Sequence, residues 1–389
     1  MHDIVIAGYA RTPFHFARKG QLVDVRPDDL AAIAVRALVE RSGIDPRDIE
    51  DLLLGCAYPE AEQGDNAARI VGLLAGLPIA TGGVTLNRFC GSSMTAIHFA
   101  AGQIALGAGE VFVCAGMESM TRVPQGGFKP SPNPRFRSAA QPDAAPQAEI
   151  DLEAYVTMGR TAENVAARYG ITRAEQDAFG LASQRKAAAA QAAGRLEDEI
   201  APVATAAGLI VIDGCLRPQS TLDGLAALKL AFDAQGTVTA GTASPLTDGA
   251  AAVLVCTARY AREHGLEVLA RVRATAVAGV SPEVMGIGPV PATRKALARA
   301  GLAIGDIDIV EINEAFASQA LACLRELGID EARVNLDGGA IAIGHPLGAT
   351  GARITGKAAQ LLKREGKRYA LATQCIGGGQ GAATILEAV

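Results

Sequence analysis

Residues 338–353 read Gly-Gly-Ala-Ile-Ala-Ile-Gly-His-Pro-Leu-Gly-Ala-Thr-Gly-Ala-Arg. One of the five histidines of the chain, His345, lies here between Gly344 and Pro346. Glycine permits close approach of a neighbouring segment and proline fixes the turn, so this setting can aim an imidazole ring. The sequence after Pro346 predicts a helix to about Arg364, followed by a strand over Arg368–Gln374.

The same order of elements occurs earlier in the chain, around Cys90. The strand-like run Gly83–Leu86 precedes this cysteine, and the small residues after it predict a helix to about Gly107. A strand over Glu110–Ala115 follows. Reactive side chains thus occupy matching places in two halves, which indicates an internal duplication.

Strand-like and helical runs alternate along both halves, and this alternation predicts a layered α/β fold with a largely parallel or mixed sheet. In the first half we expect strands over Asp3–Ala7 and Ile49–Cys56, and helices over Asp28–Ser42 and Asn66–Ala75. In the second half we expect strands over Ala270–Val280, Ile307–Ile312, Arg368–Gln374 and Ala382–Glu387, and helices over Ala292–Ala300 and Ala315–Leu327.

A different kind of sequence separates the halves. Pro124–Pro146 is rich in Pro, Ala and Ser and predicts an exposed loop, whereas the Ala-rich Thr161–Leu181 and Ser183–Ala193 predict helices. We therefore divide the chain into three parts. These are an N-terminal half at 1–119, completed by about 238–268, an inserted, mostly helical loop or lid domain at 120–237, and a C-terminal half at 269–389.

Composition limits the class of protein. The 389 residues are 49% hydrophobic and carry a net charge of −5. That length can bury a large core, and the negative charge argues against a nucleic-acid partner, because phosphate neutralisation needs a basic surface. The seven cysteines are scattered without a CxxC pair, so we expect neither disulfides nor a metal site, and a reducing, cytoplasmic location. The apolar run 1–8 is too short for a signal peptide or a membrane span.

Three side chains carry the expected chemistry. Cys90 at the start of a helix is predicted to have its thiol pKa lowered from about 8.5 by a unit or more. A neutral His345 can accept the Cys90 proton, the usual way to activate a nucleophile, and can later donate its N–H to an oxyanion. Cys375 ends an apolar strand and leads into a glycine-rich turn whose N–H groups can form an oxyanion hole.

The remaining cysteines and histidines are interpreted as structural. They are Cys56, Cys114, Cys215, Cys256 and Cys323, and His2, His15, His98 and His264. Two nucleotide-binding motifs are rejected. The glycines after Cys375 precede a strand rather than the helix that a dinucleotide site needs, and residues 351–358 lack the Ser or Thr of a P-loop and lie within a predicted helix.

Four motifs, taken together and in this order, resemble the thiolases, the acetyl-CoA acyltransferases and acetyltransferases. They are Asn87-Arg88-Phe89-Cys90-Gly91-Ser92-Ser93, Asn313-Glu314-Ala315-Phe316-Ala317, Gly344-His345-Pro346-Leu347-Gly348-Ala349-Thr350-Gly351 and Cys375-Ile376-Gly377-Gly378-Gly379-Gln380-Gly381. The resemblance extends from Arg11 to Gly381, and is closest to the degradative 3-ketoacyl-CoA thiolases of fatty acid metabolism.

The resemblance implies a duplicated five-layered α-β-α-β-α fold with a loop domain, in a homodimer or homotetramer. Acyl-CoA and CoA would be substrates, with no permanently bound cofactor. Cys90 would attack the keto carbon of a 3-ketoacyl-CoA, His345 would take its proton, and Cys375 would protonate the acetyl-CoA enolate and later deprotonate the second CoA. One oxyanion hole would comprise His345 and a water held by Asn313, the other the N–H groups of Cys90 and Gly377.

The resemblance also implies contacts with CoA. Arg217 would lie near the nucleotide and Ser244 near the pantetheine, with apolar walls from Met158, Phe232 and Phe316. The chain departs from the family pattern at Gly224, where some members carry a CoA-contacting serine. It also departs at Thr157, where acetoacetyl-CoA specialists tend to carry histidine, and this favours broader or longer acyl substrates.

Three other classes are considered beside this one. A ketoacyl-synthase-like condensing enzyme shares the implied fold and a cysteine nucleophile, but Cys375 occupies the place where such enzymes carry His or Asn. Cys90-Gly91-Ser92 faintly suggests a papain-like peptidase, which the duplicated layout opposes. A non-catalytic CoA-binding scaffold is opposed by the intact Cys90, Asn313, His345 and Cys375.

Overall fold

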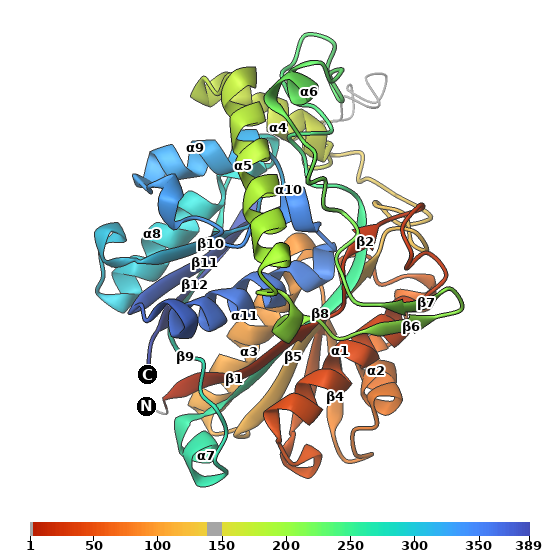
Figure 1. The fold of residues 1–389 in the computed structure, drawn as a ribbon, viewed down its shortest axis with the longest axis vertical. Coiled ribbons are helices and arrows are strands. Elements are labelled where there is room, and N and C mark those ends of the chain that lie inside the picture. The colour runs from red at the N-terminus through yellow and green to blue at the C-terminus, as the bar shows by residue number, and fades with distance from the viewer. Residues whose placement is uncertain (1–2, 138–149) are drawn as a thin grey trace.

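The computed structural model describes residues 3–137 and 150–389. Ten of the described strands form one mixed sheet (Figure 1). The first half contributes β1 (Ile4–Arg11), β2 (His15–Phe16), β3 (Asp51–Gly55), β4 (Gly82–Leu86), β5 (Val111–Ser119) and β8 (Thr247–Thr257). The second half contributes β9 (Ala270–Gly279), β10 (Ile309–Ile312), β11 (Tyr369–Ile376) and β12 (Gln380–Glu387).

The pairing of the strands repeats between the two halves. The order along the sheet is β10-β11-β12-β9-β1-β8-β5-β3-β4, and β2 pairs with β8. In the first half β3 and β5 are parallel while β8 is antiparallel to β5 and β1; in the second half β10 and β11 are parallel while β12 is antiparallel to β11 and β9. The predicted duplication is therefore present in the topology.

The two halves of the sheet meet only briefly, at β1 and β9. Two residue pairs connect these strands, Val5 with Arg271 and Ile6 with Ala270. The chain ends lie near this junction, where Arg271 forms an ion pair with Asp3 and also approaches Glu387. The two halves are thus joined by little backbone pairing, and helices can pack on both faces of each.

The long helices form three layers around these two half-sheets. They are α1 (Pro27–Ser42) and α2 (Ala67–Ala75), α3 (Ser92–Leu106) and α11 (Leu347–Glu365), and α8 (Pro289–Ala300) and α9 (Ala317–Leu327). The first pair shares a core with the first half-sheet and the last pair shares a core with the second. Between them, α3 and α11 contact each other and both half-sheets. This confirms the predicted five-layered α-β-α-β-α fold.

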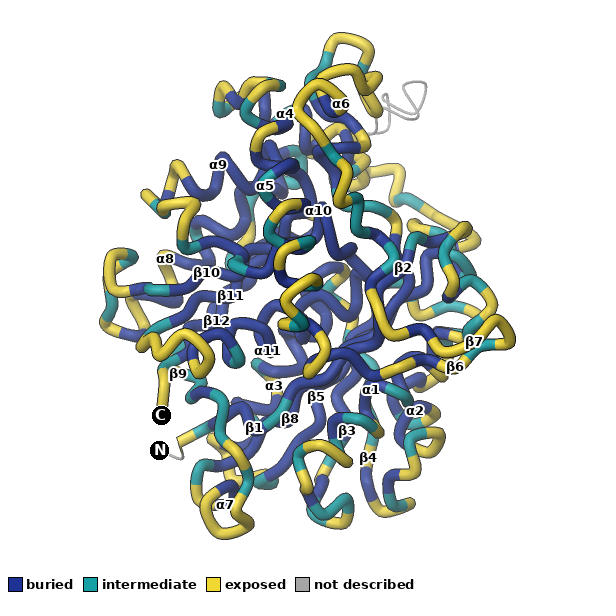
Figure 2. The backbone as a smooth tube through the Cα atoms, in the orientation of Figure 1, coloured by how far each residue is buried: buried dark blue, intermediate teal, exposed yellow. Residues whose placement is uncertain are grey.

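In the middle layer, α11 is buried along most of its length (Figure 2). The hydroxyl of Ser93 on α3 accepts a hydrogen bond from the backbone N–H of Ala352 on α11, at 2.8 Å. Close to it, a Cβ on Gly351 would lie 2.2 Å from the backbone nitrogen of Met94. Only a residue without a side chain lets the first turns of these two helices come so close.

The described residues of the segment between the halves include α-helices and a β-hairpin. These are α4 (Met158–Tyr169), α5 (Arg173–Ala192), α6 (Leu222–Ala226) and the strands β6 (Val203–Thr205) and β7 (Gly208–Ile210). Short helices complete the fold at α7 (Ala258–Glu263) and α10 (Ala340–Ile343). Residues 138–149 of the predicted exposed loop, and His2, lie outside the described residues.

One predicted helix boundary in this segment is wrong. A break was expected between Leu181 and Ser183, but α5 continues through both residues. The break lies at Gly170, which ends α4 with φ +62°, and at Thr172, whose side chain caps α5 together with Glu175. Glycine in the left-handed conformation and a capping box are strong stop and start signals, and they outweigh the alanine content.

The strand β8 has no counterpart among the predicted strands. Its sequence, TDGAAAVLVCT, is rich in alanine, yet all eleven residues are buried between β1 and β5. Within residues 3–137 and 150–389, no helix is long and apolar enough to cross a membrane.

A matched pair of glycine substitutions tests the middle layer. Gly351→Ala should lower the free energy of unfolding by about 1–3 kcal/mol, because the added Cβ overlaps Met94 and the helices must separate. Gly305→Ala, at an exposed position of the 3-10 turn Ile304–Asp306 with open space around it, should instead change stability by no more than about 0.5 kcal/mol. Urea denaturation of both variants measures the difference, and equal effects would contradict this account of the helix contact.

Candidate active site

Cys90 lies in a single 3-10 turn, Phe89–Gly91, directly before α3. The preceding Phe89 has φ +44°, in the left-handed region that non-glycine residues rarely adopt. Such strain is held in place by the surrounding structure and is common at functional sites. The side chain of Cys90 is 7% exposed and packs with Ala57, Met120 and Leu347.

Burial dominates the ionisation of the Cys90 thiol and raises its pKa to about 11. The backbone N–H groups of Gly377 and of Cys90 itself hydrogen-bond to the sulfur and lower the pKa, but by less, while the charge of Glu118 raises it further. The predicted lowering of this pKa at the helix N-terminus is therefore wrong. At neutral pH Cys90 is a thiol and needs a base to become a nucleophile.

His345 is 4% exposed and lies in the short connection between α10 and α11. Gly344 has φ +114°, and the backbone N–H of His345 donates to the hydroxyl of Thr247 at 3.0 Å. Burial, and then the positive charge of Arg353, lower the pKa of His345 to about 3. The imidazole is neutral at physiological pH and can accept a proton.

The hydrogen bonds of His345 select one tautomer. Its Nδ1 lies 2.6 Å from the hydroxyl of Thr350, and that hydroxyl donates its single proton to the carbonyl of Pro346 at 2.9 Å. Thr350 must then accept from His345, so Nδ1 carries the proton. Nε2 keeps its lone pair and accepts from the Asn313 amide at 3.3 Å. The nitrogen that can take up a proton is therefore Nε2, which lies beside Asn313.

Cys375 lies on β11 and is fully buried. Burial, followed by the charges that Cys90 and Cys323 would carry as thiolates, raises its pKa well above the ordinary value. Two neighbouring thiols whose charges repel do not both ionise at the same time. Gly377, two residues later, points its N–H at the sulfur of Cys90.

The structure brings the predicted residues together in two contacting groups. The turn that holds Cys90 packs on β11, which holds Cys375, since a Cβ on Gly91 would lie 2.4 Å from the Ile376 side chain; Asn313 and His345 are hydrogen-bonded to each other. The groups meet through Leu347, which follows His345 by two residues and packs against Cys90. In the described part of the chain no hydrogen bond joins Cys90 to His345, a looseness that is common before substrate binds.

Four of the five predicted CoA contacts form one surface. Met158 and Phe316 share an apolar cluster with Cys375, and the rings of Phe232 and Phe316 lie 5.9 Å apart, edge to face. Ser244 is tied to this wall, because its N–H and its hydroxyl both donate to the carbonyl of Ala315. An apolar wall with one hydroxyl at its edge suits a pantetheine arm.

Arg217, the fifth predicted contact, stands apart from this wall. It is half-buried, and its guanidinium donates to the carbonyls of Ala240 at 3.4 Å and Ile341 at 3.3 Å. Its Nε has no hydrogen-bond partner among the described residues.

Two residues that the sequence did not single out hold His345 in place, Thr247 and Thr350. Thr350 belongs to the same small-residue stretch and lies five residues after His345, at the end of the first turn of α11, and this nearness in sequence is a signal that could have identified it. Thr247 comes from β8, a strand the pattern did not indicate, so no local signal linked it to His345.

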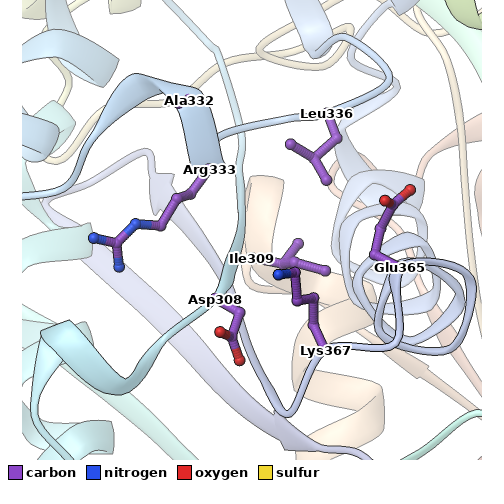
Figure 3. Close-up of a pocket in the computed structure, with 7 residues that line it drawn as sticks. All are labelled: Asp308, Ile309, Ala332, Arg333, Leu336, Glu365 and Lys367. Carbon is purple, nitrogen blue, oxygen red and sulfur yellow. The ribbon is translucent and has the colours of Figure 1, made fainter.

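A surface cavity of about 350 Å³ lies away from these residues (Figure 3). Its lining is Asp308, Ile309, Ala332, Arg333, Leu336, Glu365 and Lys367. Arg333 and Asp308 form hydrogen bonds with the backbone. Arg333 donates to the carbonyl of Ile307, and Asp308 accepts from the N–H groups of residues 368 and 369. The cavity contains none of the predicted site residues, and two of its charged side chains, Arg333 and Asp308, are engaged by backbone groups.

Known proteins resemble this chain over its full length. Family models described as the thiolase N-terminal and C-terminal domains match residues 4–259 and 266–388. The chain is 47% identical to a 3-ketoacyl-CoA thiolase of Bacillus subtilis and 45% identical to one of Colwellia psychrerythraea, over the full length of each. Human mitochondrial 3-ketoacyl-CoA thiolase, solved in complex with CoA, superimposes with a TM-score of 0.89 at 38% identity, covering 100% of this chain and 98% of that one.

The protonation of Cys90 gives a direct test of the site. With a pKa of about 11, the rate of alkylation of Cys90 by iodoacetamide should rise about tenfold per pH unit from pH 6 to 9. Mass spectrometry of the Cys90 peptide at each pH measures this rate. A plateau already reached at pH 7 would show a thiolate at rest and would contradict the dominance of burial.

Proposed function

The chain belongs to the thiolase family, and from this premise we propose that it cleaves 3-ketoacyl-CoA to acetyl-CoA and a shortened acyl-CoA, or runs the reverse condensation, through an acyl group carried on Cys90. The observation that carries the proposal is the juxtaposition of one neutral imidazole and two buried thiols. These groups match a reaction in which a proton and a negative charge move back and forth within one pocket.

The first half of the reaction begins with the Cys90 thiol. As substrate binds, His345 Nε2 comes within reach of the sulfur and takes its proton, and the thiolate attacks the 3-keto carbon. The tetrahedral oxyanion is stabilised by N–H donors aimed at the site. Removing one such donor typically costs 10²–10³-fold in rate, so this stabilisation is a large share of catalysis.

Carbon–carbon cleavage follows from the same geometry. The bond between C2 and C3 breaks, C3 stays on Cys90 as a thioester, and the leaving electron pair forms the enolate of acetyl-CoA. Cys375 donates its proton to C2 and becomes a thiolate. Asn313 and the imidazole face the thioester oxygen of the enolate, and the unpartnered Oδ1 of Asn313 is available to hold a water there.

The second half returns the protons. A new CoA thiol gives its proton to the Cys375 thiolate and attacks the acyl group on Cys90, with the N–H groups of Cys90 and Gly377 as the oxyanion hole. The intermediate collapses, the acyl-CoA leaves, and the Cys90 sulfur recovers the proton held on His345. Both thiols and the imidazole are then in their starting states, so CoA is consumed as a substrate and no other cofactor is required.

The CoA molecule is proposed to lie along the wall of Met158, Phe232, Phe316 and Ser244. This wall leads to Cys375, the residue that must exchange a proton with the CoA thiol. Arg217 is proposed to meet the nucleotide end, which requires its guanidinium to leave the two carbonyls that it now contacts.

We further propose the division into an N-terminal half at 1–119 with 238–268, a loop domain at 120–237 and a C-terminal half at 269–389. Supporting it, β8 pairs with β1 and β5, whereas α4, α5 and α6 lie outside the half-sheets. The proposed location is the cytoplasm, which suits seven free cysteines.

A homodimer or homotetramer is proposed from the free edge at β4. This strand ends the sheet, and an edge strand offers unpaired backbone groups to a second chain. Large apolar side chains are exposed on the elements beside it: Ile70, Leu73 and Leu74 on α2, Ile79, and Phe99 and Leu106 on α3.

Cysteine variants test the chemistry. Cys90→Ala should reduce thiolysis of a 3-ketoacyl-CoA by at least about 10³-fold and abolish the acyl adduct. Cys375→Ala should reduce turnover by about 10²–10⁴-fold, since general acid–base catalysis contributes this much, while Cys90 still takes up an acyl group from acyl-CoA. Steady-state rates and intact-protein mass spectrometry provide both readouts.

The matched control is Cys114→Ala, which removes a buried thiol of β5 outside the site and should leave turnover near normal. Near-normal turnover of Cys90→Ala would defeat the assignment. Wild-type protein that takes up no acyl group would favour the non-catalytic scaffold.

The assembly has its own test. Light scattering after size exclusion should give a molar mass two or four times 39.9 kDa. Leu106→Asp, at a side chain that is 83% exposed, should shift the protein toward smaller species, because a charge is costly within an apolar interface. Leu209→Asp, at an exposed site on β7, should leave the mass unchanged. A monomeric wild type would rule out the interface.

A further inference from the structure

One carboxylate behind the site has no part in the reaction described above. Glu118 lies near the end of β5, an otherwise uncharged strand, and is 1% exposed. Burying a charge in this way is costly unless hydrogen bonds compensate for the lost water. The contacts of Glu118 therefore indicate what it does.

The Glu118 carboxylate accepts hydrogen bonds from both halves of the fold. On the first half, Oε2 accepts from the N–H of Ala57 at 2.8 Å, and Oε1 accepts from the N–H of Tyr58 at 3.3 Å and from the Gln63 amide at 2.7 Å. On the second half, Oε2 accepts from the N–H of Gly348 at 2.9 Å. The thiol of Cys56 also donates to Oε1, at 3.9 Å. Since all five partners are donors, the hydrogen bonding fits the ionised form.

These partners flank the two residues that must exchange a proton. Ala57 packs against Cys90, and the Tyr58 ring lies 6.0 Å from that of Phe89, the residue before Cys90. Gly348 is in the first turn of α11, three residues after His345. A Cβ on Gly348 would lie 2.2 Å from the carbonyl oxygen of Met117, so α11 begins in direct contact with the end of β5.

The charge of Glu118 also reaches Cys90. Burial raises the pKa of Glu118, its N–H donors lower it, and no Lys or Arg within the described ranges forms an ion pair with it. Its negative charge is one of the causes that raise the pKa of Cys90. The other ionisable groups that interact with Cys90 are Tyr58 and Cys375, both neutral at physiological pH.

We propose that Glu118 is a positioning residue for acyl transfer: its carboxylate ties the segment behind Cys90 to the first turn of the helix that follows His345, and its charge adds to the effect of burial in opposing ionisation of the nucleophile before the base takes its proton. The proposal rests on the proposed role of Cys90 as nucleophile. The length of the Glu118 side chain and its negative charge can be tested separately by substitution.

Glu118→Gln removes the charge and turns an NH2 group toward N–H donors. Its kcat for thiolysis should fall by about tenfold or more while KM for CoA changes by less than about threefold. Alkylation of Cys90 by iodoacetamide at pH 8 should become at least about threefold faster, because a nearby negative charge no longer opposes the thiolate. If Glu118 had only a structural role, replacing it by Gln would not accelerate the alkylation of Cys90.

Glu118→Asp keeps the charge but shortens the reach. It should lower kcat, while the dependence of Cys90 alkylation on pH stays as in the wild type. This variant also keeps the test available if Glu118→Gln does not fold, since unchanged kcat in Glu118→Asp would overturn the positioning role.

Glu314→Gln is the matched control for charge. Glu314 is also a buried carboxylate with donor partners, Ser183, Asn335 and the N–H of Ile341, but it is not among the groups that shift the pKa of Cys90. Glu314→Gln should therefore leave the alkylation rate of Cys90 unchanged.

Alkylation of Cys90 in Glu118→Gln at the wild-type rate, or equal acceleration in Glu314→Gln, would overturn the charge role. Iodoacetamide needs no thiolase activity, so this result is independent of turnover. If the wild-type protein had no thiolase activity, the proposed function would be wrong. The comparison of alkylation rates would still test the effect of Glu118 on Cys90.

Discussion

The contact between the first turns of α3 and α11 in the middle layer is the constraint on which the rest of the structure depends. Gly351 has no side chain to hold the helices apart, and Ser93 joins them by accepting from Ala352. Because each helix begins just after a reactive residue, bringing the two N-termini together also brings Cys90 and His345 to one place. The duplicated topology supplies one helix from each half, and the two half-sheets enclose both.

Enclosure then decides the electrostatics of the site. Burial raises the pKa of both thiols and lowers that of the imidazole, so the resting site contains neutral groups. Charge appears only as the reaction proceeds, at the oxyanion and the enolate, where N–H donors are already directed. Preorganised dipoles in a buried site stabilise such transient charge without rearranging. A permanent thiolate would be stabilised by the same donors before substrate arrived, and that stabilisation would not lower the barrier.

Several buried acidic and basic side chains lie behind the site. Glu118 and Glu314 bind backbone N–H groups on either side of His345, at Gly348 and Ile341. Arg353, two turns further along α11, faces Glu311 on β10. Each of these groups connects an element of one half or of the loop segment to the chain around His345, so the position of the imidazole depends on the assembled fold more than on its own neighbours in sequence.

The sequence by itself determined the alternation of helices and strands, the duplication, and the identity of Cys90, His345, Asn313 and Cys375 as candidates, because these depend on local patterns and on residue types with few other uses. It did not determine β8, whose alanines favour a strand only when β1 and β5 lie on either side. Nor did it determine the ionisation of Cys90, since the helix N-terminus is visible in the sequence but the burial that outweighs it is not. The roles of Thr247 and Glu118 likewise arise from contacts between residues about one hundred or more positions apart, which only the tertiary structure creates.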